Sequence, residues 1–82
     1  MTNRVFTVLS RPWCHLCHEL IDALTPIAQQ YGWHIKEIDI DQAPELEAQW
    51  DEQIPVLLAD GVEICRHRLN TDAVHAFCQA KR

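Results

Sequence analysis

The sequence has few of the features that mark unusual classes of protein. Its 82 residues include only two glycines, with no internal repeat, low-complexity segment or linker, which excludes a collagen-like or disordered chain. No segment approaches the roughly 18 consecutive apolar residues of a membrane helix. The opening MTNRVFTVLS has neither the apolar run nor the cleavage site of a signal peptide. We therefore expect one cytoplasmic domain over residues 1–82, with no membrane partner.

Basic residues are also scarce. Seven lysines and arginines stand against twelve acidic residues, which gives a net charge of -5. An acidic surface repels phosphate backbones, so we expect no nucleic-acid partner. In a reducing cytoplasm, the four cysteines of the chain are expected to be reactive thiols or small core residues rather than a structural disulfide framework.

The hydrophobic pattern predicts an α/β domain with the element order βαβαββα. Short β-branched and apolar runs predict strands over residues 5–9, 34–40, 56–59 and 62–65. The connection between the first two strands is long enough for a parallel crossover through a helix. Asp60 and Gly61 between the last two strands predict a tight β-hairpin turn.

The longest predicted helix follows the first strand. Its apolar residues recur at helical spacing on one side, at Leu16, Leu20, Leu24, Ala28 and Tyr31. Gly32 is a plausible stop for this helix, and Pro26 predicts a kink or an early break.

Two shorter helices complete the prediction. One begins near Pro44, with Leu46 and Trp50 as its apolar face and its acidic residues as a solvated face. The last helix is capped by Asn70 and buries a stripe of Val74, Phe77 and Cys78, with Lys81 and Arg82 at its negative end.

The motif CHLC, from Cys14 to Cys17, stands where the first strand gives way to the first helix. Free amide hydrogens and the positive end of the helix dipole favour a thiolate at Cys14. Arg11 adds a positive charge if its side chain turns inward, and His15 adds another when protonated. A cysteine in such a place has a pKa of roughly 3.5 to 7.5, against about 8.5 for a free thiol.

Cys17 lies one helical turn beyond Cys14 on the same face, within reach of a disulfide. It is therefore the natural resolving thiol once Cys14 has formed a mixed disulfide with a substrate. The residues Gln53-Ile54-Pro55, directly before the predicted hairpin, offer a surface for that substrate.

Together these features resemble the glutaredoxin-like branch of the thioredoxin superfamily over nearly the whole chain. The resemblance implies a four-stranded mixed sheet flanked by helices, and a small thiol-disulfide oxidoreductase. It also implies that Pro55 is cis beside the dithiol, that the backbone of Ile54 pairs with the substrate chain, and that Arg11 assists thiolate formation. Trp13, directly before Cys14, looks more like a thioredoxin feature and joins Ile54 and Pro55 as a substrate-binding residue.

The resemblance further implies no tightly bound cofactor, with glutathione as a co-substrate. The expected partners are disulfide-bearing proteins or glutathione mixed disulfides as substrates, and a reductase or glutathione as the electron donor. The protein itself is expected to be a monomer. After the hairpin, however, the chain reads CRHRLN where many glutaredoxins have two glycines and acidic residues. Arg68 has the wrong sign for the ammonium group of glutathione, whereas Arg66 or Arg68 suits its carboxylates.

Three other interpretations stay open at this stage. Cys14, Cys17 and His18 can supply metal or iron-sulfur ligands, with Cys65 or His67 as the fourth. The CxxCH pattern also matches c-type haem attachment, but Met1 is the only methionine, so the common axial ligand pair is missing. The third is a thioredoxin-fold binding module whose dithiol is idle.

The remaining candidates have simpler explanations. Cys65 is as well explained by strand packing as by an auxiliary role, and Cys78 by the core. Solvated positions account for His34, His67 and His75, and packing accounts for Trp33 and Trp50.

Overall fold

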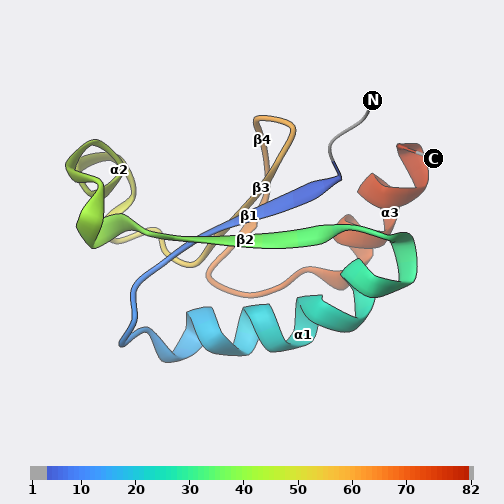
Figure 1. Cartoon of the computed structure of the whole chain (residues 1–82), viewed down its shortest axis with the longest axis horizontal. Helices are drawn as coiled ribbons and strands as arrows, with labels where there is room; N and C mark the ends of the chain where they lie inside the picture. Colours follow the sequence, from blue (N-terminus) through green and yellow to red (C-terminus); the bar gives the residue numbers. More distant parts are fainter. Residues whose placement is uncertain (1–3, 82) are drawn as a thin grey trace.

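A computed structural model describes residues 4–81 of the chain (Figure 1). Met1 and Arg82, which entered the predictions above, lie outside the described residues. The elements follow the predicted order βαβαββα, with a short 3-10 turn at Ile40–Gln42. Their bounds are β1 Val5–Ser10, α1 His15–Tyr31, β2 His34–Asp39, α2 Pro44–Trp50, β3 Val56–Ala59, β4 Val62–Arg66 and α3 Thr71–Ala80.

The four strands form one mixed sheet in the order β2-β1-β3-β4, which confirms the prediction. β1 and β2 run parallel, with Val5 opposite His34 and Ser10 opposite Asp39. β3 runs antiparallel to β1, with Val56 opposite Leu9. The parallel pair is possible because α1 provides the crossover between its two strands.

The β3–β4 hairpin turns at the two predicted residues. Asp60 and Gly61 both have positive φ angles, of 52° and 75°. Two consecutive residues with positive φ are typical of the two-residue turns whose twist matches that of the strands.

Helix α1 begins and ends as the sequence indicates, but Pro26 does not break it. Gly32 ends the helix in the left-handed conformation, with φ 73°, and the Trp33 amide returns to the Ala28 carbonyl at 2.8 Å. The predicted early break is wrong because Leu24 and Ile27, on either side of Pro26, are both buried. Tertiary packing of an apolar face supplies most of the stability of a helix in a protein, so it outweighs one lost hydrogen bond.

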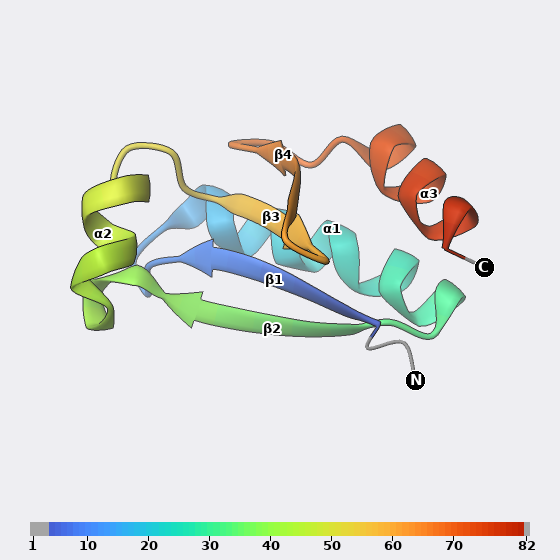
Figure 2. The ribbon, with the colours of Figure 1, turned by 90° about the horizontal axis from the view of Figure 1, so that it is seen from above.

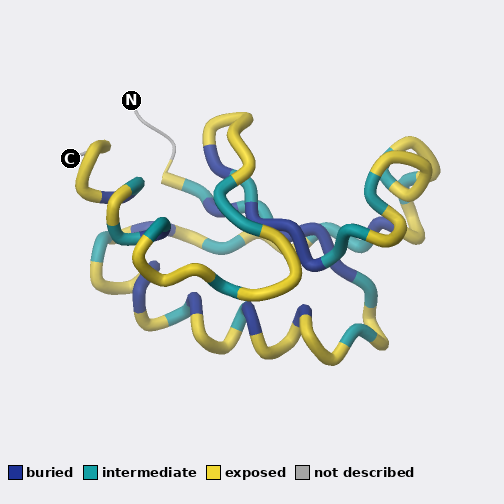
Figure 3. Tube along the Cα trace, turned by 180° about the vertical axis from the view of Figure 1, so that it is seen from behind, coloured by how far each residue is buried: buried dark blue, intermediate teal, exposed yellow. Residues whose placement is uncertain are grey.

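The helices cover the two faces of the sheet unequally. α1 and α3 pack on one face, where Leu24 and Val74 meet Val8 and Leu57 in the larger core cluster. Figure 3 shows the buried positions of α1 turned toward the sheet and the exposed ones turned away. α2 lies where β1 and β2 end (Figures 1 and 2). Its side chains and the connection to β3 cover a smaller cluster on the other face, made of Leu9, Ile40 and Val56 with Leu46, Trp50 and Ile54.

Two details of the predicted packing are wrong. Leu16 is 43% exposed, because Cys17 and then Leu20 face the sheet in the first turns of α1. His75 is not simply solvated, since its ring Nδ1 lies 2.8 Å from the Tyr31 hydroxyl and forms a hydrogen bond with it. Within residues 4–81, no helix has the length and apolar character that crossing a membrane would demand.

Candidate active site

Cys14 lies at the start of α1, as the sequence predicts, and acts as the N-cap residue of the helix. Its backbone is extended, with φ -84° and ψ 107°. The Cys14 amide donates to the Arg11 carbonyl at 3.0 Å, which closes the turn after β1. The Cys17 amide donates to the Cys14 sulfur at 3.2 Å. The sulfur therefore satisfies one of the amide groups that the helix leaves without a carbonyl partner.

Cys14 and Cys17 are joined by a disulfide, with their Cα atoms 5.2 Å apart. The two cysteines differ in their exposure to solvent. Cys17 is fully buried, whereas Cys14 is partly exposed. An incoming molecule can therefore reach the first cysteine of the motif, while the second lies behind it against the sheet.

The Arg11 side chain is directed toward the segment around α2. Its Nε donates to Asp41 at 2.7 Å, and one terminal nitrogen forms a short ion pair with Asp51. The hydrogen bond to Asp51, followed in size by the one to Asp41, raises the pKa of Arg11 above its usual value. Two carboxylates thus offset the positive charge that we expected beside Cys14. The sequence reasoning missed these partners because it treated the acidic residues near α2 as a solvated surface.

The two residues that flank Cys14 in sequence are open to solvent. Trp13 is 72% exposed, and the Arg11 guanidinium lies 5.4 Å from the centre of its ring. The His15 side chain is 94% exposed, and its Nε2 atom lies 4.0 Å from a carboxylate oxygen of Glu19. Both side chains are therefore free to meet a molecule that approaches the Cys14 sulfur.

The Ile54-Pro55 peptide bond is cis, as the family resemblance implies. Val56 pairs with Leu9 near the end of β1. Pro55, directly before Val56, therefore lies at the end of the sheet from which the Cys14 loop departs. The Pro55 carbonyl accepts a hydrogen bond of 2.7 Å from the His67 amide. His67 has a φ of 67°, a conformation that is uncommon outside glycine. This contact fixes the connection between β4 and α3 against the proline.

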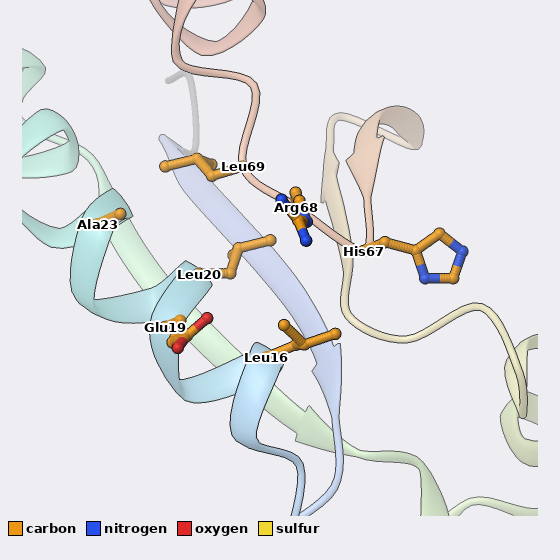
Figure 4. A pocket seen from close by; sticks show the side chains of 7 residues that line it. All are labelled: Leu16, Glu19, Leu20, Ala23, His67, Arg68 and Leu69. Carbon is orange, nitrogen blue, oxygen red and sulfur yellow. The ribbon is translucent and has the colours of Figure 1, made fainter.

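A cleft of about 320 Å³ opens between the first turns of α1 and that connection (Figure 4). Leu16 and Leu20 line it from the helix, and Leu69 lines it from the other side. Glu19 and Arg68 add charges of opposite sign. Sequence reasoning missed this cleft because it assigned Leu16 to the core, although the position of that residue between the two cysteines was a signal.

Arg66, the second candidate for a carboxylate of glutathione, already has partners. Its guanidinium pairs with Glu63 at 2.6 Å, donates to Gln53 and lies 5.7 Å from the centre of the Trp50 ring. The ion pair lowers the pKa of Glu63 and raises that of Arg66.

The other cysteines do not join the site chemically. Burial raises the pKa of both the Cys65 and the Cys78 thiol. Cys78 is 2% exposed, which confirms its place in the core. In the part of the chain that the structure describes, no three histidine, cysteine or acidic side chains gather where they could hold a metal ion. The ligand set considered for zinc is therefore not assembled within one chain.

Comparisons with known proteins agree on the family of this chain. A model of the glutaredoxin-like domain (DUF836) matches residues 5–79. The uncharacterized protein Rv0508 of Mycobacterium tuberculosis is 31% identical over an alignment of 82 positions that covers 88% of this chain and 84% of that protein.

Solved structures agree with this match. Protein Ne2328 from Nitrosomonas europaea superposes with a TM-score of 0.83 at 29% identity, over 94% of this chain and 93% of that one. Thioredoxin 1 from Thermosipho africanus gives a TM-score of 0.64 at 19% identity, over 94% and 97% of the two chains, and this likeness shows the fold alone. The chain therefore has a thioredoxin-like fold, and it belongs to the glutaredoxin-like domain family within the thioredoxin superfamily.

Proposed function

We propose that this protein is a thiol-disulfide oxidoreductase in which Cys14 is the nucleophile and Cys17 the resolving thiol. One observation carries the proposal: a partly exposed cysteine accepts an amide hydrogen bond on its sulfur at the start of a long helix, and a fully buried cysteine is joined to it. This arrangement suits a redox cycle better than an idle binding module, which has no use for a difference in access between its two thiols.

The cycle conserves atoms and electrons. The Cys14 thiolate attacks one sulfur of a substrate disulfide, forms a mixed disulfide and releases the other substrate sulfur as a thiolate, which takes a proton. Cys17 then loses its proton and attacks the Cys14 sulfur, which releases the second substrate thiol. The substrate gains two electrons, and the protein becomes the disulfide form described above. An external thiol or a reductase then reduces the protein.

The helix terminus is the main source of thiolate stabilisation in this proposal. The Cys17 amide that bonds to the sulfur in the disulfide form remains in place to bond to a thiolate, and hydrogen bonds to a charged group are stronger than neutral ones. Arg11 contributes less than its full charge because Asp41 and Asp51 share it. His15 contributes only when it is protonated, and its exposure screens the effect.

The substrate disulfide lies between Trp13 on one side and Ile54 with Pro55 on the other. Trp13 directly precedes the reactive cysteine and is exposed, and aromatic residues of this kind anchor many protein interfaces. No tightly bound cofactor is required, and glutathione or a reductase supplies electrons to a cytoplasmic monomer. This last part of the proposal rests on the family resemblance.

Trapping of a mixed disulfide tests the assigned roles. Cys17→Ser, incubated with a disulfide-bearing peptide, should accumulate a covalent adduct on Cys14 that peptide mass mapping detects, because no thiol remains to resolve it. Cys14→Ser should accumulate none, and Cys65→Ser is the matched control and should behave as wild type. An active wild type whose Cys17→Ser variant traps nothing, or traps through another cysteine, would overturn the assignment.

A further inference from the structure

The cleft beside the disulfide, called the Leu16 cleft below, has an apolar floor and a charged rim. Figure 4 shows the Leu16 and Leu20 side chains reaching from α1 toward the connection between β4 and α3. Leu69 closes the far side, whereas the His67 ring points away from the helix (Figure 4). The cleft encloses about 320 Å³, which leaves room for a large aliphatic or aromatic side chain.

The Leu16 cleft includes one of two exposed apolar residues that lie close to Cys14 in the sequence. Only three large hydrophobic residues are exposed between residues 4 and 81, at Trp13, Leu16 and Val62. Two of them flank Cys14, one residue before it and two residues after it. Exposed apolar side chains gathered at one place mark an interaction site more often than scattered ones do. Because Leu16 lies two residues after Cys14 and lines the cleft, the cleft adjoins the motif that a substrate sulfur approaches.

The positive charge at the rim has no ion-pair partner within the described residues. Arg11 and Arg66 are both held by carboxylates. Arg68, by contrast, forms no ion pair within residues 4–81 and is exposed at the cleft. Glu19, across the floor, has only the 4.0 Å contact with His15. A guanidinium without an ion-pair partner, next to an apolar floor, favours the binding of an aliphatic side chain that has a carboxylate next to it.

We propose that the Leu16 cleft is a specificity pocket that binds an apolar side chain beside the reacting cysteine of a polypeptide disulfide, with an acidic neighbour on Arg68. This inference rests on the proposed function and names its substrate class. Glutathione has no apolar side chain besides its cysteine, so the apolar floor gives it no added affinity. A leucine buried there removes its side chain from water, which strengthens binding of the polypeptide substrate.

A single-turnover assay tests this substrate class. Reduced protein is mixed with short peptides whose cysteine forms a mixed disulfide with thionitrobenzoate, and the released thionitrobenzoate is followed by absorbance. One peptide set has a Leu-Glu pair before or after the cysteine, and the matched set has Ser-Gln. The thionitrobenzoate mixed disulfides of mercaptoethanol and of glutathione serve as small-molecule reference substrates. We expect the better Leu-Glu peptide to react about tenfold faster than its Ser-Gln match, the change that burial of one aliphatic side chain allows.

Two variants locate the preference. Ala23→Trp fills the cleft from the exposed face of α1, and Arg68→Glu reverses the rim charge. Each should lower the ratio of the Leu-Glu rate to the mercaptoethanol rate about fivefold to tenfold. Ala76→Trp, at an exposed alanine of α3, is the matched control and should leave the ratio unchanged.

The outcomes separate this inference from the function on which it rests. Equal rates for all peptides, a preference for the glutathione reference, or an unchanged ratio in Ala23→Trp would overturn the cleft proposal while leaving the oxidoreductase intact. Release of thionitrobenzoate from every substrate no faster than free cysteine achieves would instead overturn the proposed function itself.

Discussion

The Nε atom of Arg11 donates to the Asp41 carboxylate at 2.7 Å, across 30 positions of sequence. The same guanidinium also pairs with Asp51, just after α2. The loop that leads to Cys14 is thereby tied to the segment that leads to Pro55. α2 itself has no fully buried residue, so this ion-pair cluster acts together with the partly buried Leu46 and Trp50 to hold the segment in place.

Arg11→Met should therefore lower the Tm, because it leaves Asp41 and Asp51 without their shared partner. Because the carboxylates of Asp41 and Asp51 are exposed to solvent, salt screens these ion pairs, and the Tm difference from wild type should shrink as the salt concentration rises from roughly 0.1 to 1 M. Arg68→Met is the control, since Arg68 forms no ion pair within the described residues, and its Tm should match that of wild type. Calorimetry at both salt concentrations checks this, and an Arg11→Met deficit that is unaffected by salt would argue against the ion pairs.

The same substitution should change the pKa of the Cys14 thiol only slightly, by less than about one unit. The reason is that Asp41 and Asp51 already offset the charge of Arg11, so removing it removes little net positive potential at the sulfur. The pH dependence of Cys14 alkylation in reduced Arg11→Met gives the value. A rise of two units or more would show that Arg11, rather than the helix terminus, is the principal stabiliser of the thiolate.

The Cys65 thiol should be alkylated slowly, at a rate that depends on pH. Burial raises its pKa above the usual value, so less of it is ionised at neutral pH, and its alkylation rate should rise with pH to beyond about 8.5 before it levels off. The oxidised protein isolates this thiol, because Cys14 and Cys17 are then blocked by their disulfide. Mass mapping after timed alkylation measures the rate. A plateau below pH 8 would contradict the assigned burial effect.

His67 should tolerate glycine better than alanine. Its φ of 67° is left-handed, a conformation that costs a residue with a Cβ atom roughly 1 kcal/mol relative to glycine. His67→Gly should therefore be more stable than His67→Ala by about 1 kcal/mol, or about 4–8 °C in Tm for a domain of this size. Thermal unfolding of the two variants makes the comparison without reference to the His67 side chain. Equal Tm values would mean that the loop relaxes to another backbone conformation.

The order of elements was predictable because it depends on local patterns. Short β-branched and apolar runs placed the four strands, helical periodicity and caps placed the three helices, and Asp60, Gly61 and Gly32 marked the turns. The place of Cys14 at a helix start followed from the same local pattern.

What the sequence could not predict depends on contacts between distant positions. The pairing of Arg11 with Asp51 spans 40 positions, and no local pattern connects them. Leu16 fits a helical apolar stripe as well as Cys17 does, and only the position of the sheet decides which of them is buried. Pro26 is tolerated for a related reason, because the packing on either side of it arises only in the folded chain.

The central claim is that the start of α1 keeps Cys14 ionised near neutral pH. The most direct measurement is the alkylation rate of Cys14 as a function of pH in the reduced wild-type protein, resolved from Cys17, Cys65 and Cys78 by mass mapping. The helix terminus should place the midpoint below about pH 7.5. A midpoint at or above about 8.5, the value of an unperturbed cysteine, would contradict it.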